Sequence, residues 1–218
     1  MEGQWIAHAS ALPGCYAGAG DRETALALVP DAIREFVAWR RMHGETGGVD
    51  DAVDTHVEEI VREWPDPADP EYIVNAFFAS DVPALTADDI RWARERLDWQ
   101  RAELFAAFDG LSPEVMRQPV DGEWSIGGIL NHTGRAEWWY LERLDLALPR
   151  DQEPKDWRGR LDMAREQLLR VLTSLEGVAR VVVKNAEMWS PRKMLRRALW
   201  HERDHTLHLL QFRARLGV

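Results

Sequence analysis

The sequence predicts an α+β protein in which a mainly α-helical, four-helix up-down bundle follows a small unit made of a β-hairpin and a helix. Two observations predict this class. After residue 85, apolar residues recur at helical spacing in stretches of about twenty residues, each with a recognisable start or stop. Before residue 45, short apolar runs flank a Pro-Gly turn. Helices with one apolar face each bury those faces most economically against one another.

The N-terminal segment has the pattern of a hairpin followed by a helix. Trp5-Ile6-Ala7-His8 and Cys15-Tyr16-Ala17 flank a turn at Leu12-Pro13-Gly14, which predicts two short strands. A helix is expected from about Asp21 to Arg41. The spacing at Val57–Val61 fits a strand and a helix equally well, and we interpret it as a strand.

Turn residues divide the chain in two places. Glycines and aspartates cluster between residues 44 and 54, and prolines alternate with aspartates between 65 and 70. We therefore expect an N-terminal domain over residues 1–65, a linker over 66–85 and the bundle over 86–218.

The first two bundle helices have predicted N-caps. Thr86 precedes two aspartates and predicts a helix over residues 86–109. Ser125 predicts a second helix over residues 125–147, which ends before Pro149.

The last two bundle helices are bounded by residues with special backbone preferences. The third is expected over residues 155–176 and is terminated by Gly177. The fourth is expected over residues 191–215, with Ser190 as its N-cap and Pro191 at its first position.

Composition limits the classes of function. The chain has 37 acidic and 27 basic residues and a net charge of -10, which opposes binding to nucleic acid or to an anionic membrane. No apolar run approaches the roughly 18 residues that a membrane span requires. Cys15 is the single cysteine, which excludes an internal disulfide, and the first residues lack the pattern of a signal peptide. We expect a cytoplasmic protein.

The segment Trp200–His208 carries three histidines on the last predicted helix. His201 and His205 are separated by about 6 Å of helix rise on nearly the same face, so they can converge on one metal ion. His201 and His208 are separated by about 10.5 Å of rise, too far to share an ion. The pair is therefore either His201 with His205 or His205 with His208.

His132 is the candidate for a third ligand. Catalytic divalent ions usually take three protein ligands and keep one position for water or substrate. His132 lies in mid-helix beside the stripe that is expected to face the bundle interior, where facing helices build metal sites. A buried histidine satisfied by a hydrogen bond is the alternative for His132 alone.

The pattern His-Glu-x-x-His also occurs in zincin proteases, in which the glutamate, here Glu202, activates water. Little sheet is predicted that could hold a peptide, and Glu202 points about 100° away from His201 around the helix. We therefore expect Glu202 to pair with a neighbouring arginine. His208 is expected to line the site or support a ligand.

Other residues near the candidate ligands have structural explanations. Trp124, Trp139 and Arg135 could line an approach to His132, but we favour core packing for the tryptophans and pairing with a glutamate for Arg135. The last helix also carries basic residues, which we interpret as a solvated basic face that offsets acidic neighbours rather than as a nucleic-acid site. These are Arg192, Lys193, Arg196, Arg197 and Arg203.

Residues from about 86 to 217 resemble the DinB superfamily, especially over Trp124–His132 and Leu195–His205. The resemblance implies a four-helix bundle that holds a divalent metal, commonly zinc or nickel, through one histidine of the second helix and a His-x-x-x-His pair of the fourth. Carried over by position, the implied metal ligands are His132, His201 and His205. Some relatives are transferases or isomerases that use a low-molecular-weight thiol as cosubstrate, which implies a small-molecule substrate. No catalytic side chain is assigned.

Residues 1–65 are similar to the HicB-like antitoxin fold, a small β-sheet with a helix, over Gly3–Ala7, Leu12–Ala17, Gly20–Ala25 and Asp31–Ile33. Such antitoxins commonly carry a DNA-binding module after this unit, whereas a bundle is predicted here. The unit is therefore expected to cover the bundle or to mediate homodimerisation. Three interpretations stay open. The first is a metal-dependent thiol transferase, and the second is a non-catalytic metal-binding or regulatory protein whose HicB-like unit contacts a partner. In the third, the HicB-like unit is the active part and the bundle is a scaffold.

Overall fold

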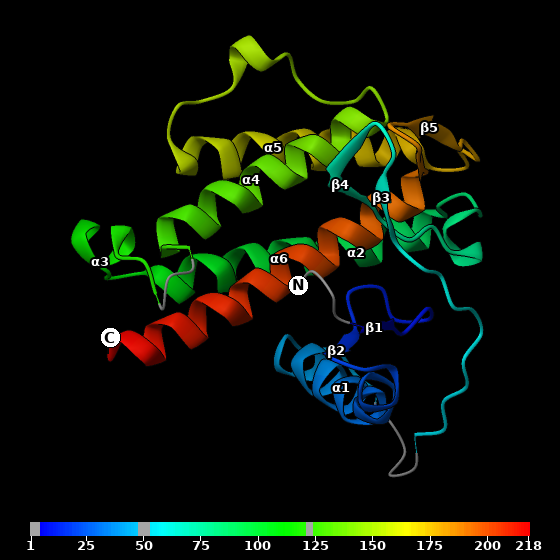
Figure 1. The fold of residues 1–218 in the computed structure, drawn as a ribbon, viewed down its shortest axis with the longest axis horizontal. Coiled ribbons are helices and arrows are strands. Elements are labelled where there is room, and N and C mark those ends of the chain that lie inside the picture. The colour runs from blue at the N-terminus through cyan, green and yellow to red at the C-terminus, as the bar shows by residue number, and fades with distance from the viewer. Residues whose placement is uncertain (1–4, 48–52, 121–123) are drawn as a thin grey trace. The chain divides into compact units, whose positions relative to one another are not determined.

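The computed structural model describes residues 5–47, 53–120 and 124–218. It divides into two compact units, an N-terminal unit, Met1–Ile60, and a C-terminal unit, Val61–Val218. The described residues form helices and short antiparallel strand pairs joined by loops and turns (Figure 1), which agrees with the predicted α+β class.

The N-terminal unit consists of a hairpin followed by a helix, as predicted. Strand β1 (Trp5–His8) pairs antiparallel with β2 (Tyr16–Ala19). Helix α1 (Arg22–Met42) follows, and its N-cap Asp21 accepts a hydrogen bond from the backbone N–H of Thr24. The backbone N–H groups of the first turn have no acceptor within the helix. Because the Asp21 side chain accepts a hydrogen bond from one of them, the helix begins at the predicted place.

The strand predicted at Val57–Val61 is wrong. Residues 53–63 form neither helix nor strand, and most of their side chains are exposed. A short strand without a buried face or a pairing partner has little to stabilise it. Two other parts of the predictions, Gly3-Gln4 and residues 48–52 of the predicted break, lie outside the described residues.

The described part of the C-terminal unit contains four long helices, whose bounds agree with the predicted ones to within a few residues. Helix α4 packs beside α5 and against α6, and α2 packs beside α6 (Figure 1). None of the described helices combines the length and the apolar composition that crossing a membrane requires. The four are α2 (Ala87–Phe108), α4 (Ile126–Arg143), α5 (Trp157–Leu172) and α6 (Pro191–Leu216).

The predicted helix starts are confirmed by their hydrogen bonds. Thr86 and Asp89 form a reciprocal capping box at the start of α2. The hydroxyl oxygens of Ser125 and Ser190 accept hydrogen bonds from backbone N–H groups in the first turns of α4 and α6. Pro191 occupies the first position of α6, where its missing N–H has no cost.

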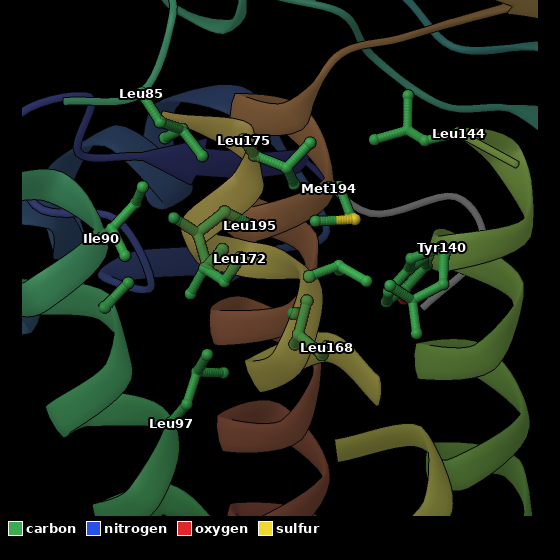
Figure 2. Packing of buried hydrophobic residues seen from close by; sticks show 14 of the residues in the cluster. Leu85, Ile90, Leu97, Tyr140, Leu144, Leu168, Leu172, Leu175, Met194 and Leu195 are labelled. Atoms are coloured by element: carbon green, nitrogen blue, oxygen red, sulfur yellow. The ribbon is translucent and has the colours of Figure 1, made fainter. Parts of the chain in front are cut away.

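The apolar faces of these helices meet in a common core. Figure 2 shows Leu97 of α2, Tyr140 of α4, Leu168 of α5 and Leu195 of α6 directed into the same space. Each of these side chains is buried. Trp189, just before α6, is fully buried in the same cluster. Burial of the predicted stripes therefore holds the helices together.

Two hairpins in the C-terminal unit were not expected from the sequence. Strand β3 (Trp64–Asp66) pairs with β4 (Asp69–Val74), and β5 (Val182–Lys184) pairs with β6 (Glu187–Trp189). The segment predicted as a linker, residues 66–85, thus contains β4 within the C-terminal unit. The remaining elements are short: α3 (Pro113–Arg117) and the 3-10 turns η1 (Ala79–Asp81), η2 (Arg150–Gln152) and η3 (Thr173–Leu175).

Helices α4 and α5 approach each other closely at Gly134. A Cβ atom there would lie 3.0 Å from the backbone nitrogen of Leu161 and 3.2 Å from the carbonyl carbon of Arg160. Because backbone atoms cannot move aside cheaply, Gly134→Ala should lower the free energy of unfolding by about 1–3 kcal/mol in urea denaturation.

Gly128→Ala, on the same helix, is the matched control. Its Cβ would meet the Ser125 hydroxyl oxygen at 3.4 Å, an ordinary contact. Since alanine favours a helix over glycine, this variant should be neutral or more stable by up to about 1 kcal/mol. Equal destabilisation by both variants would show that the close approach at Gly134 does not matter.

Candidate metal centre

Three histidines from two helices converge in the C-terminal unit. The Nε2 atom of His201 lies 3.0 Å from Nε2 of His132 and 3.0 Å from Nε2 of His205. One potential ligand atom from each residue lies within 4.8 Å of the other two. His201 is buried, and His132 and His205 are partly buried. The spacing and fold therefore bring together the three residues that the resemblance implied.

Local structure explains this convergence. His132 lies two turns into α4, whose start is set by the Ser125 cap. His201 and His205 are one turn apart on α6, so both imidazoles leave the helix on the same face. Because α4 packs against α6, that face is directed toward His132.

Burial keeps the three imidazoles neutral. It lowers the pKa of His132, and the positive charge of Arg197 lowers it further. Burial and the neighbouring histidines hold the pKa of His201 well below its ordinary value. The pKa of His205 falls to about 3 through burial and the proximity of His132. Neutral imidazole is the form that binds a metal ion.

The geometry of the cluster fits a divalent ion. The Nε2 atom of His201 carries at most one proton, so it cannot donate hydrogen bonds to both of its neighbours. A tetrahedral ion with bonds of about 2.0–2.1 Å to nitrogen would place its ligand nitrogens about 3.3–3.4 Å apart, close to the observed 3.0 Å. An ion among the three nitrogens would accept their lone pairs, which otherwise face one another.

Aromatic rings border the three histidines. The Trp124 ring packs edge-on against His132, with ring centroids 4.6 Å apart, and half of its side chain is exposed. The Tyr140 ring contacts His201 with centroids 5.8 Å apart. Trp124 therefore borders the cluster on its solvent side, whereas core packing had been favoured for it.

The other candidates from the sequence lie outside the cluster. Trp139 packs against other aromatic side chains, including Trp189, which agrees with the predicted core role. The Nε atom of Arg135 lies 3.7 Å from Oε1 of Glu153, which agrees with the prediction that Arg135 pairs with a glutamate. His208 stacks beside His205 with ring centroids 6.4 Å apart and is not part of the converging group.

Glu202 belongs to a separate, buried ionic network. Its Oε2 atom accepts hydrogen bonds from Arg101 Nη2 at 2.7 Å and from Arg165 Nη2 at 2.9 Å. Both arginines also donate to Glu137, at 2.7 Å each. The exposed fractions of these four residues lie between 2% and 8%. The network connects α2, α4, α5 and α6 beside the histidine cluster.

The partners of Glu202 argue against a role as a general base. Burial raises the pKa of this carboxyl, but the charges of Arg165 and Arg101 outweigh burial and bring it below the ordinary value. A zincin glutamate must be free to take a proton from water beside the ion. Glu202 instead accepts hydrogen bonds from arginine on both of its carboxylate oxygens, as expected from the sequence.

The first basic residues of α6 pair with acidic residues, as expected, but the predicted solvated face is wrong because their side chains are buried or partly buried. The side chains of Lys193 and Glu187 are fully buried and form an ion pair at 2.6 Å. Burial lowers the pKa of Lys193 to about 8, although Glu187 opposes the shift.

Two other basic residues of α6 also form ion pairs. Arg192 pairs with Asp89, and Arg196 pairs with Asp81. Except for Lys193 with Glu187, these partners lie more than 100 residues away in the sequence, so helical periodicity could not reveal them.

A family model described as the DinB superfamily matches residues 96–209, more than half of the 218 residues. The matched region contains the three converging histidines and does not include the N-terminal unit. No curated protein and no solved structure matches the chain. Because the family model covers most of the C-terminal unit, the chain belongs to the DinB superfamily.

Proposed function

We propose that the protein is a metal-dependent enzyme in which His132, His201 and His205 bind one divalent ion, either zinc or nickel. The observation that carries the proposal is the convergence of three Nε2 atoms from α4 and α6. Neutral imidazole suits both metals, and three protein ligands leave a coordination position open. The packing of α4 with α5 and α6, and of α2 with α6, supports an up-down four-helix bundle around the site.

The proposed reaction is attack of a thiol sulfur, or of a water oxygen, on the electrophilic carbon of a small molecule. The new S–C or O–C bond forms as the bond to a leaving group breaks, and the departing group takes up the proton that the thiol or water loses. The ion would act as a Lewis acid that lowers the pKa of a thiol or water at its open position. A low-molecular-weight thiol is the proposed cosubstrate. Trp124 borders the solvent side of the site, and the network around Glu202 holds α6 in place.

Metal analysis of the protein purified without chelator tests this function. We expect about one equivalent of zinc or nickel per chain, which a chelator removes and which rebinds afterwards. Protein that contains no stoichiometric metal and rebinds neither ion would refute the site.

A measurement of catalytic turnover distinguishes the proposed enzyme from a non-catalytic binding protein. The alternative is a non-catalytic metal-binding or regulatory protein whose N-terminal unit, proposed to be HicB-like, contacts a partner; that unit is compact by itself and lies outside the matched family region. Metal-loaded protein should consume a free thiol in the presence of an electrophile panel, and His132→Ala should abolish the consumption. Stoichiometric binding without turnover would favour the alternative.

A further inference from the structure

Arg197 is a cation beside the histidine cluster that the proposed function does not yet use. It lies one turn before His201 on α6, so the two side chains share a face of the helix. The Tyr140 ring lies next to both side chains: its centroid is 5.4 Å from the guanidinium carbon of Arg197 and 5.8 Å from the centroid of the His201 ring. Arg197 therefore contributes to the electrostatic potential at the proposed metal position.

The guanidinium of Arg197 is held in a defined orientation. Its Nη1 atom donates a hydrogen bond to Asn75 Oδ1 at 2.7 Å. The group also lies over the rings of Trp200 and Tyr140, 4.8 Å and 5.4 Å from their centroids. Since Tyr140 also contacts His201, one aromatic ring adjoins both the cation and a proposed ligand.

Arg197 differs from its basic neighbours on α6 in its partners. Arg192, Lys193 and Arg196 each form an ion pair with a carboxylate. In the parts of the chain that the structure describes, no ion pair involves Arg197, and its buried Nε atom has no hydrogen-bond partner. A partly buried cation whose donor is unsatisfied is costly unless an anion accompanies it.

Among the residues that the structure describes, two carboxylates near this site are already engaged. Glu187 accepts hydrogen bonds from Lys193 and Tyr72, and Glu202 accepts hydrogen bonds from two arginines. Three neutral imidazoles would leave the charge of a divalent ion uncompensated. With such an ion bound, the site would carry a strong positive charge in a chain whose net charge is -10, and an anionic ligand would supply the balancing negative charge.

We propose that Arg197 is the anion-binding residue of this site and receives the carboxylate of a small substrate or cosubstrate whose other end reaches the metal ion. The inference rests on the proposed function. A planar guanidinium binds a planar carboxylate through parallel hydrogen bonds, and its single charge matches a monoanion. The stacking on Trp200 and the bond to Asn75 orient the guanidinium in advance, which reduces the entropy lost on binding.

Thiols with and without a carboxylate test the inference on cobalt-loaded protein. The visible absorption of Co²⁺ reports the binding of a thiol to the ion independently of any turnover. We would titrate 3-mercaptopropionate against the neutral 3-mercapto-1-propanol, and mercaptoacetate against 2-mercaptoethanol. In at least one pair, the thiol with a carboxylate should bind at least about 10-fold more tightly than the neutral thiol. A hydrogen bond between charged groups contributes an affinity difference of this size.

Variants of Arg197 test whether this residue causes the preference for thiols that carry a carboxylate. Arg197→Met should reduce the affinity ratio to about one while the affinity for the neutral thiol and for cobalt is retained. Arg197→Lys keeps the charge without the planar geometry and should give an intermediate ratio. Arg192→Met removes a cation of α6 that is paired with Asp89, and it should leave the ratio unchanged.

The outcomes distinguish the two proposals. Failure of the wild-type protein to bind cobalt would refute the metal site itself. Cobalt binding with equal affinities for the charged and neutral thiols would leave the metal site intact and overturn the role of Arg197, even if neither Arg197 variant folds. A preference that persists in Arg197→Met would overturn it as well.

Discussion

Replacing His201 with alanine should reduce affinity for the divalent ion more than about 100-fold. Its Nε2 atom lies 3.0 Å from the corresponding atoms of both His132 and His205, so it is the central member of the cluster. Loss of a residue that only supports a ligand typically costs about 10–100-fold, and loss of a ligand should cost more. Competition with a chromophoric chelator measures the affinity. His132→Ala and His205→Ala should show losses of the same order.

His208→Ala is the matched control for the histidine variants. His208 is on the same helix and stacks on His205, but it lies outside the converging group. Its loss should change affinity far less than the loss of His201. Equal losses for His201→Ala and His208→Ala would show that the wrong pair of histidines has been assigned.

Thermal denaturation provides an independent measurement. An ion that binds only the folded state at about 1,000 times its Kd should add about 4 kcal/mol to the free energy of unfolding. Zinc should therefore raise the Tm of the wild-type protein and of His208→Ala. It should not raise the Tm of His201→Ala, whose site would lack its central ligand.

Replacing Glu202 with glutamine should lower the free energy of unfolding by about 3–5 kcal/mol, the usual cost of removing one partner from a buried ion pair. The change leaves Arg101 and Arg165 with one carboxylate, Glu137, for two buried charges. The backbone acceptors of the two arginines, Leu161 and Leu97, cannot replace the lost negative charge. Urea denaturation of the metal-free protein measures the effect without a contribution from metal binding.

Glu114→Gln provides the control for the loss of a carboxylate. Glu114 pairs with Arg117 at 3.2 Å, but about three quarters of its side chain is exposed. Exposed pairs contribute little, so this variant should change the free energy of unfolding by less than about 1 kcal/mol. If Glu202 were instead a general base of the zincin type, Glu202→Gln would fold with near wild-type stability and lose hydrolytic activity.

The helical part of the fold could be predicted from local sequence. Thr86, Ser125 and Ser190 cap their helices because a side-chain oxygen satisfies backbone donors only a few residues away. Such interactions depend little on the rest of the chain, so the predicted starts agree with the structure. The HicB-like resemblance of the N-terminal unit stays a prediction, because the family match does not extend to it.

The hairpins of the C-terminal unit were missed for different reasons. The β5–β6 turn places Asn185 and Ala186 at φ values of 50° and 57°, and an asparagine after a run of valines indicates such a turn. That hairpin could have been predicted. β4 continues into residues that bond α6 through Asn75, which provides acceptors for Lys193 and Arg197. Its position depends on those distant contacts, and the turn residues alone indicated a linker.

The sequence by itself determined the helix boundaries and the placement of His201 and His205 on one helix face, because both follow from the geometry of a few consecutive residues. The tertiary structure decided which distant side chains meet. His132 lies beside His201, although the two are 69 residues apart in the sequence. Glu202 pairs with Arg101, which is 101 residues away in the sequence. A charged side chain on a helix has the same sequence pattern whether it faces water or a buried counter-ion. Only the packing of α2, α4, α5 and α6 decides which arginines have a carboxylate partner. It pairs Arg101 and Arg165 with Glu202, whereas Arg197 forms no ion pair with a carboxylate of the described residues.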